Sequence, residues 1–82
     1  KNKNELLILA SIIQMESKIP DDSKLVASVF INRLNRNMKL QSDVTLAYGF
    51  KINGQQITKK MLRSNNPYNT YKFYGLPPTP IS

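Results

Sequence analysis

The sequence predicts a mainly helical protein with little or no β-sheet, and three observations support this fold class. Apolar residues dominate 6–15 and recur at helical spacing through 25–34. Asn, Pro, Tyr and Gly take over from Ser64 onward, which is typical of irregular structure. The chain has 82 residues, the length of one small domain or of part of a larger protein. We therefore expect two packed helices followed by short helices and extended loops, α+β at most.

The two longest helices are expected in the first half of the chain. The first covers 4–17 and is apolar on nearly every side, and Lys18-Ile19-Pro20 should end it, since a residue before proline avoids helical angles. Asp21, Asp22 and Ser23 then offer oxygens that cap a second helix, which runs to about Asn35. The two helices should pack as a hairpin. The expected inward stripe of the second helix is Leu25, Val26, Val29, Phe30 and Leu34.

Shorter elements are expected in the second half. Met38-Lys39-Leu40 alternates in polarity and predicts a short strand or an extended stretch. Ser42-Asp43 is typical of a cap for a short helix over 44–48, which the following glycine stops. A further helix is expected over 57–63, with a threonine near its cap.

The composition excludes several kinds of chemistry. The sequence has no cysteine and no histidine, which removes thiol chemistry, disulfides, histidine-based triads and the usual zinc sites. The three glycines lie far apart, so a phosphate-binding loop is excluded. The longest apolar run, 6–10, is far shorter than the roughly 20 residues that span a bilayer. We therefore expect no metal and no cofactor, and we take the chain as a fragment, so a missing anchor says nothing about a parent protein.

The net charge of +7 indicates either solubility alone or attraction to a polyanion such as nucleic acid, anionic lipid or cell-wall polymer. The basic residues are scattered singly, apart from Lys59-Lys60. The sequence has no zinc-finger spacing, no RNA-binding aromatic signature and no clear recognition helix. A nucleic-acid-binding domain is therefore the weakest alternative, and we expect no nucleic-acid partner.

Glu16 is the strongest candidate for a catalytic group among the five carboxylates. In a helix it shares a face with Ile12 and Ile13, since side chains three and four positions apart stack together. A carboxyl group in apolar surroundings either pairs with a cation, here Arg33, Arg36 or a lysine, or keeps its proton more firmly. A protonated carboxyl group is what a general acid needs at neutral pH.

A single such acid favours one route for cleaving a sugar chain. Most glycosidases need two carboxylates at a set separation. Here Asp21 and Asp22 are explained as helix caps and Glu5 as a solvated charge. That leaves Glu16 and Asp43, and the alternative for Asp43 is a helix cap. A lone glutamic acid can protonate the glycosidic oxygen and then take a proton from a hydroxyl group of the same sugar. The substrate then supplies the nucleophile, and no second carboxylate need activate water.

A second polar set has the residue types of a saccharide groove. Tyrosine rings pack on the C–H faces of sugars, while amides and hydroxyl groups bond to sugar hydroxyls. The alternative is that the tyrosines only anchor loops. The candidate binding residues are Gln41, Asp43, Tyr48, Tyr68, Asn69 and Thr70.

Five segments of the chain, taken in order, resemble one known family. They are Ala10-Ser11-Ile12-Ile13-x-x-Glu16, Val26-Ala27-Ser28-Val29-Phe30-Ile31-Asn32-Arg33-Leu34, Met38-x-Leu40-Gln41-Ser42-Asp43-x-Thr45, Pro67-Tyr68-Asn69-Thr70-Tyr71 and Gly75-Leu76-Pro77-Pro78. They are similar to segments of the membrane-anchored endolytic murein transglycosylases, the MltG or YceG-like family. The resemblance covers nearly the whole chain, and the combination is far more specific than any one segment.

The resemblance implies a carbon–oxygen lyase acting on a polysaccharide. The family cleaves nascent peptidoglycan strands internally, between MurNAc and GlcNAc, and leaves 1,6-anhydro-MurNAc ends. Its single catalytic acid/base corresponds to Glu16. The segments with Gln41 and Asp43 and with Tyr68-Asn69-Thr70 are similar to groove walls near that acid.

The sequence departs from the family pattern at three positions. Gln14 stands where members often carry a second acid, which strengthens Glu16 as the essential one, because an amide cannot exchange the proton. Val44 replaces a usual proline and Thr79 a usual glycine, and both should change loop stiffness more than chemistry.

The resemblance also implies an organisation. Residues 1–82 would be part of a single YceG-like catalytic domain with a lysozyme-like core. The family's membrane helix, LysM-like subdomain and C-terminal remainder are not expected in this chain. The parent protein would sit in the bacterial cytoplasmic (inner) membrane, with its catalytic domain on the outer, periplasmic face. Its partners would be peptidoglycan strands and peptidoglycan synthases. The runner-up is a basic module that binds cell-wall glycans without cleaving them.

Overall fold

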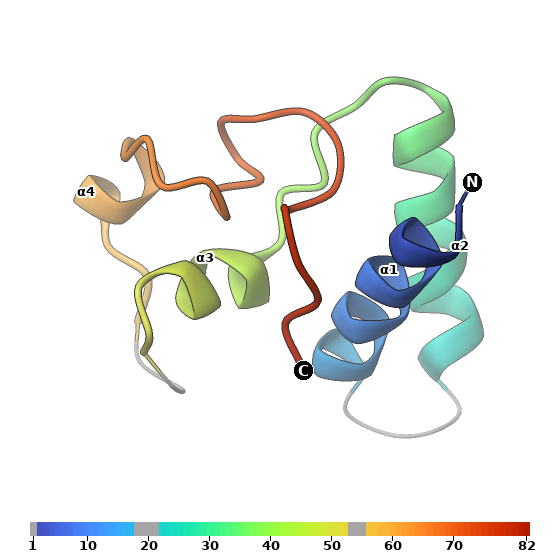
Figure 1. Cartoon of the computed structure of the whole chain (residues 1–82). Helices are drawn as coiled ribbons and strands as arrows, with labels where there is room; N and C mark the ends of the chain where they lie inside the picture. Colours follow the sequence, from blue (N-terminus) through green and yellow to red (C-terminus); the bar gives the residue numbers. More distant parts are fainter. Residues whose placement is uncertain (1, 18–21, 53–55) are drawn as a thin grey trace.

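The computed structural model describes residues 2–17, 22–52 and 56–82. Within these ranges the chain forms four α-helices and no strand, as Figure 1 shows: α1 (Lys3–Glu16), α2 (Ser23–Asn35), α3 (Asp43–Gly49) and α4 (Lys59–Leu62). The mainly helical fold class is confirmed, and each expected helix is present within a few residues of its predicted bounds. Residues 38–40 connect α2 to α3 outside any strand. The expected helix stop at 18–20 and the cap at Asp21 lie outside the described residues.

Helix α1 begins with a capping box. The Asn2 side chain accepts a hydrogen bond from the Glu5 N–H (2.8 Å), and the Glu5 carboxylate accepts one from the Asn2 N–H (3.1 Å). Two N–H groups that lack partners within the helix are thereby satisfied. Glu5 therefore does more than the solvated charge that the sequence predicts, and it fixes the start of α1.

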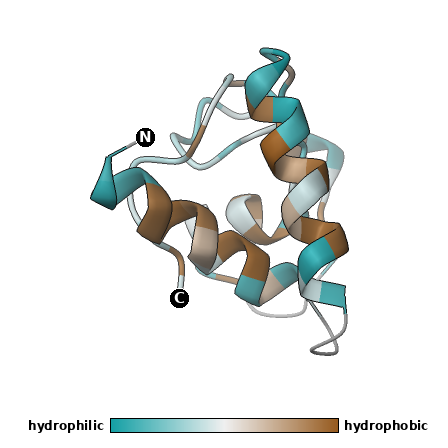
Figure 2. Cartoon of the chain, turned by 90° about the vertical axis from the view of Figure 1, so that its right-hand side faces the viewer, coloured by the Kyte–Doolittle hydropathy of each residue, from teal (hydrophilic) through white to brown (hydrophobic). Residues whose placement is uncertain are grey.

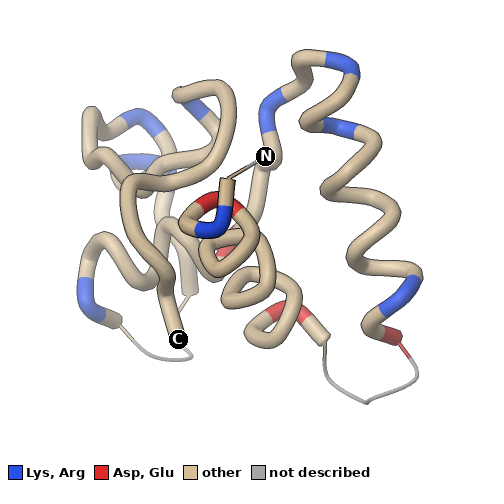
Figure 3. The backbone as a smooth tube through the Cα atoms, turned by 45° about the vertical axis from the view of Figure 1, so that its right-hand side comes forward, with Lys and Arg blue, Asp and Glu red and all other residues tan. Residues whose placement is uncertain are grey.

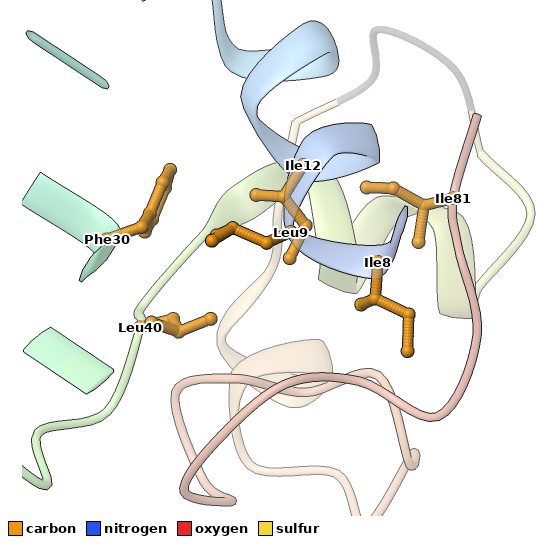
Figure 4. Close-up of a cluster of buried hydrophobic side chains, with 6 residues drawn as sticks. All are labelled: Ile8, Leu9, Ile12, Phe30, Leu40 and Ile81. Carbon is orange, nitrogen blue, oxygen red and sulfur yellow. The ribbon is translucent and has the colours of Figure 1, made fainter. Parts of the chain in front are cut away.

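The hydrophobic core lies along one side of α1, which packs against both α2 and α3. Ile12 and Leu40 are 0% exposed, and burying a side chain of this size stabilises the fold by about 1.5–3 kcal/mol. Ile81 reaches the same core from the far end of the chain, and its N–H donates to the Ser11 hydroxyl (2.9 Å). The six buried core residues, drawn in Figure 4, are Ile8, Leu9, Ile12, Phe30, Leu40 and Ile81.

The predicted inward stripe of α2 is only partly right. Phe30 is buried, and Val26 and Leu34 pack against the core. Leu25 and Val29 are instead 67% and 39% exposed. Among the described helices, α2 packs mainly against α1, so a narrower stripe of α2 is covered than its apolar spacing predicts. Figure 2 shows the contrast between α1, apolar along most of its length, and α2, where polar and apolar residues alternate.

The charged residues are distributed as the sequence predicts. Lys and Arg are scattered around the described part of the chain rather than gathered on one helix (Figure 3). Among the described residues, no helix combines the length and the apolar character needed to cross a bilayer.

Candidate active site

Glu16 is the last residue of α1, and the segment that leads into α3 passes beside it. The Ser42 hydroxyl donates a hydrogen bond of 2.6 Å to Glu16 Oε2, a length typical of strong hydrogen bonds to carboxyl groups. Ser42 is 1% exposed, whereas Glu16 is half-buried. The end of α1 and the start of α3 are thus joined at the carboxyl group.

Two threonines hold Ser42 in place. The Thr70 hydroxyl accepts from the Ser42 N–H (2.9 Å) and lies 2.9 Å from the Thr45 hydroxyl. Thr45 in turn donates to the Ser42 carbonyl (3.0 Å). All three side chains are buried, and we call Ser42, Thr45 and Thr70 the hydroxyl network. Because each member bonds to the others, a substitution at any one of them should change how the Ser42 hydroxyl is oriented toward Glu16.

Arg33 approaches the site from α2 but is engaged elsewhere. Its Nη1 donates to the Leu40 carbonyl at 2.5 Å. Among the described residues, the hydrogen-bond partner of the Glu16 carboxyl group is the Ser42 hydroxyl rather than a guanidinium. An ion pair between Glu16 and Arg33 would favour a structural role for Glu16. The hydrogen bonds of these two side chains instead go to Ser42 and to the Leu40 carbonyl.

Asp43, the first residue of α3, is paired with Tyr71. The Tyr71 hydroxyl donates to Asp43 Oδ1 at 2.5 Å. Burial, this hydrogen bond and the negative charge of Asp43 raise the pKa of Tyr71 from 10.0 to about 12, with a further contribution from Glu16 and an opposing one from Arg33. Tyr71 is therefore a protonated donor at neutral pH. Sequence reasoning missed it as a site residue, although it ends the 67–71 segment.

Asn69 and Thr70 are turned into the protein. Asn69 is 0% exposed. Its Nδ2 donates to the carbonyls of Leu62 (3.0 Å) and Ser64 (2.9 Å), and its Oδ1 accepts from the Tyr71 N–H (3.1 Å). With Thr70 in the hydroxyl network, both residues hold the loop that carries Tyr71. Their burial gives them a supporting place beside Glu16 rather than an open face toward a ligand.

Tyr48 and Tyr68 lie together at the other end of α3. Their ring centroids are 5.0 Å apart, with the rings tilted by 59°. With Gly49, Lys51 and Ile52 they line a cavity of about 400 Å³ that does not include Glu16. Helix α3 has seven residues, so its two ends are roughly 9–10 Å apart at about 1.5 Å per residue.

The six predicted binding residues thus fall into three pairs. Gln41 and Asp43 are exposed and flank Ser42, next to Glu16. Asn69 and Thr70 are buried beneath that segment. Tyr48 and Tyr68 form the separate cavity. The geometry defines a small helical unit with one acid/base candidate at a helix end and a polar surface around it.

Comparison with known proteins gives the family. The model of the YceG-like family matches residues 1–82, and the chain belongs to this family. The endolytic murein transglycosylase of Bacillus subtilis (strain 168) is 42% identical over an alignment 85 positions long, gaps included, which covers 100% of this chain and 24% of that protein. The protein of the same name from Streptococcus pneumoniae (strain ATCC BAA-255 / R6) is 42% identical over an alignment 83 positions long, which covers 95% of this chain and 15% of the relative.

A solved structure agrees with this assignment. The crystal structure of a YceG-like protein from Listeria monocytogenes is 46% identical in sequence and superimposes with a TM-score of 0.89. The match covers 96% of this chain and 26% of that one. The family resemblance inferred from the sequence is confirmed, and the chain spans between 15% and 26% of the length of these relatives.

Proposed function

We propose that this chain is the part of an endolytic murein transglycosylase that carries the catalytic acid. Such a lyase cuts the bond between MurNAc and GlcNAc in nascent peptidoglycan strands and leaves 1,6-anhydro-MurNAc ends. The observation that carries the proposal is the position of Glu16, half-buried at a helix end and bonded to a hydroxyl group rather than to a cation. Support also comes from relatives in two bacteria that bear this name.

In the proposed reaction Glu16 both gives and takes a proton. Its carboxyl group protonates the glycosidic oxygen as the bond from that oxygen to C1 of MurNAc breaks, which frees a hydroxyl group on GlcNAc. The resulting carboxylate removes the proton from the O6 hydroxyl of the same MurNAc while O6 bonds to C1. No water enters, and Glu16 ends in the protonation state in which it began.

The other predicted residues take roles that follow their positions. Gln41 and Asp43, exposed beside the acid, would bond to sugar hydroxyls. Tyr48 and Tyr68 would hold a more distant part of the strand, since aromatic rings pack on sugar C–H faces. Asn69 and Thr70 would act through the loop that they support.

The proposed setting follows from family membership. Residues 1–82 would form part of the catalytic domain of a larger protein anchored in the bacterial cytoplasmic membrane and facing its outer side. Its substrate would be peptidoglycan strands, and peptidoglycan synthases would be its partners.

The test uses the full-length parent protein and purified peptidoglycan, with products weighed by mass spectrometry. Glu16→Gln should lower the cleavage rate by at least about 10²–10⁴-fold, the usual contribution of general acid–base catalysis. Glu5→Gln is the matched control, because glutamine also serves in a capping box, and it should cleave like the wild type. Undiminished cleavage by Glu16→Gln would refute the assignment, and products heavier by one water would indicate a hydrolase.

The tyrosine-lined cavity favours one alternative, a module that binds cell-wall glycans without cleaving them. In that case the wild-type protein would sediment with peptidoglycan and release no products. Tyr48→Ala would then weaken sedimentation, and Glu16→Gln would not.

A further inference from the structure

We propose that Ser42 is a positioning residue for Glu16: its hydroxyl holds Oε2 as a hydrogen-bond acceptor, so that the catalytic proton is carried by Oε1. The inference rests on the proposed function, because Ser42 acts through the proposed acid. Two independent observations carry it. The Ser42 side chain does not cap α3 although Ser42 stands at the N-cap position, and the backbone of Gln41 is held in a rare conformation.

The first observation is the use of the Ser42 hydroxyl. Ser42 occupies the N-cap of α3, where serine is among the preferred residues because its oxygen can accept from a free N–H group. Thr58 does this for α4, accepting from the Met61 N–H at 3.1 Å. Ser42 makes no such cap, and its hydroxyl bonds instead to Glu16, 26 residues away. The Ser42 hydroxyl therefore bonds to Glu16 in place of the local hydrogen bond that would stabilise the start of α3.

The second observation is the backbone that aims this hydroxyl. Gln41 has φ +53°, in the left-handed region that residues other than glycine rarely adopt. The N–H groups of Gln41 and Ser42 both donate to Thr70, to its carbonyl (3.1 Å) and its hydroxyl (2.9 Å) respectively. Such conformations persist where surrounding contacts impose them, and they cluster at functional sites.

The chemical consequence concerns the two oxygens of the carboxyl group. The terminal torsion of a glutamate has broad minima, so an external bond is needed to fix the plane of the group. Donation by Ser42 favours Oε2 as the carbonyl-type acceptor of the acid form and leaves Oε1 to carry the proton. The proton then leaves along one direction toward the glycosidic oxygen, and orientation of this kind is a large part of catalytic efficiency.

The test compares kcat and KM for strand cleavage by the full-length protein and its variants. Ser42→Ala should lower kcat about ten- to hundredfold with KM unchanged, because the same hydroxyl bonds to the carboxylate that Glu16 becomes during the reaction, and hydrogen bonds to charged groups are the stronger ones. Ser42→Thr keeps the hydroxyl group and should restore most of the rate. Ser11→Ala is the matched control, since Ser11 is also a buried serine, bonded to Ile8 and Ile81 instead. It should lower the melting temperature and leave kcat unchanged.

A double-mutant cycle separates positioning from general structural damage. On the Glu16→Gln background, Ser42→Ala should have no further effect on the residual rate, because residues that act as one unit are not additive. An equal fall on both backgrounds, or a wild-type kcat for Ser42→Ala, overturns the inference. If Ser42→Ala does not fold, Ser42→Cys fills the same space with a weak donor and provides the same comparison.

The outcomes distinguish this inference from the proposed function. A wild-type protein that leaves peptidoglycan intact overturns the proposed function. A wild-type protein whose cleavage depends on Glu16 but not on Ser42 overturns only the positioning role.

Discussion

The middle of α1 and its last residue are held by different kinds of interaction. Ile8, Leu9 and Ile12 pack into a core that any set of apolar side chains of similar volume would fill almost as well. Glu16, at the last position, meets the hydroxyl network, whose bonds require particular donors and acceptors at particular places. The first region sets how stable the fold is, and the second sets where one carboxyl group points. Mutations should therefore separate stability from catalysis.

The largest loss of stability is expected from Ile12→Ala, at the centre of the core. Truncating a fully buried isoleucine should lower the free energy of unfolding by about 2–5 kcal/mol, because a cavity remains. Chemical denaturation measures this difference. Leu7→Ala, on the same helix but 55% exposed, is the control and should change it by about 0.5 kcal/mol or less. Equal losses would mean that the buried side of α1 is assigned wrongly.

The next largest effect is expected from Thr70→Val, in the hydroxyl network. Valine keeps the shape but cannot accept from the Ser42 N–H, and a buried unpaired group costs about 1–3 kcal/mol. Unlike Ile12→Ala, this change should also lower the kcat of the folded protein, since Ser42 is released. Thr79→Val also removes a threonine hydroxyl, one that lies at an exposed position, bonds to Tyr68 (2.7 Å) and is outside the hydroxyl network. It is the control for kcat, which it should leave unchanged. A normal kcat in Thr70→Val would remove the distinction between the middle of α1 and its last residue.

The same contrast explains what the sequence could predict. Helical spacing is a local property, so it located α1 and the acid at its end. It did not give the core side of that helix, which was expected to be apolar on nearly every side, whereas Leu6 and Leu7 are both 55% exposed. Partners far apart in the chain leave no local pattern. Ser42 was predicted to be a helix cap because Ser-Asp precedes a helix, yet its hydroxyl turns to a residue 26 positions away.

Residue type also failed to separate two uses of a polar group. An amide such as Asn69 bonds equally well to a sugar hydroxyl or to loop carbonyls, and only the fold shows that it meets Leu62 and Ser64. Tyr71 was missed because its partner, Asp43, lies 28 residues earlier in the chain, and no local pattern links the two residues. Leu25 and Val29 were placed inside because periodicity gives the direction of an apolar stripe but not how much of it a neighbour covers.

A smaller effect should come from the cavity at the far end of α3. Tyr48→Ala removes a ring that is 44% exposed, and aromatic contacts contribute about 0.5–1.5 kcal/mol. We therefore expect KM for long strands to rise by up to about tenfold with kcat unchanged. Tyr74→Ala removes another exposed ring, one near Lys39, and should leave KM unchanged. A fall in kcat for Tyr48→Ala would place this cavity with the hydroxyl network instead of apart from it.

The smallest expected effect is a pH dependence from the pair of Tyr71 and Asp43. The pKa of Tyr71 rises from 10.0 to about 12 on folding, so the folded chain holds this proton more tightly than the unfolded chain does. The resulting stabilisation is complete below the unfolded pKa of 10.0 and is lost as the pH rises from there toward about 12.

The measurement is the melting temperature of the wild type, Tyr71→Phe and Tyr74→Phe across this alkaline range. Both variants lose one phenol, but only Tyr71→Phe loses the one bonded to a carboxylate. Its melting temperature should start lower and then fall less steeply with pH than that of Tyr74→Phe, because no proton held by the fold remains to be released at that position. Parallel curves for the two variants would mean that folding does not raise the pKa of Tyr71. The pair of Tyr71 and Asp43 would then not contribute to the stability of the region around Glu16.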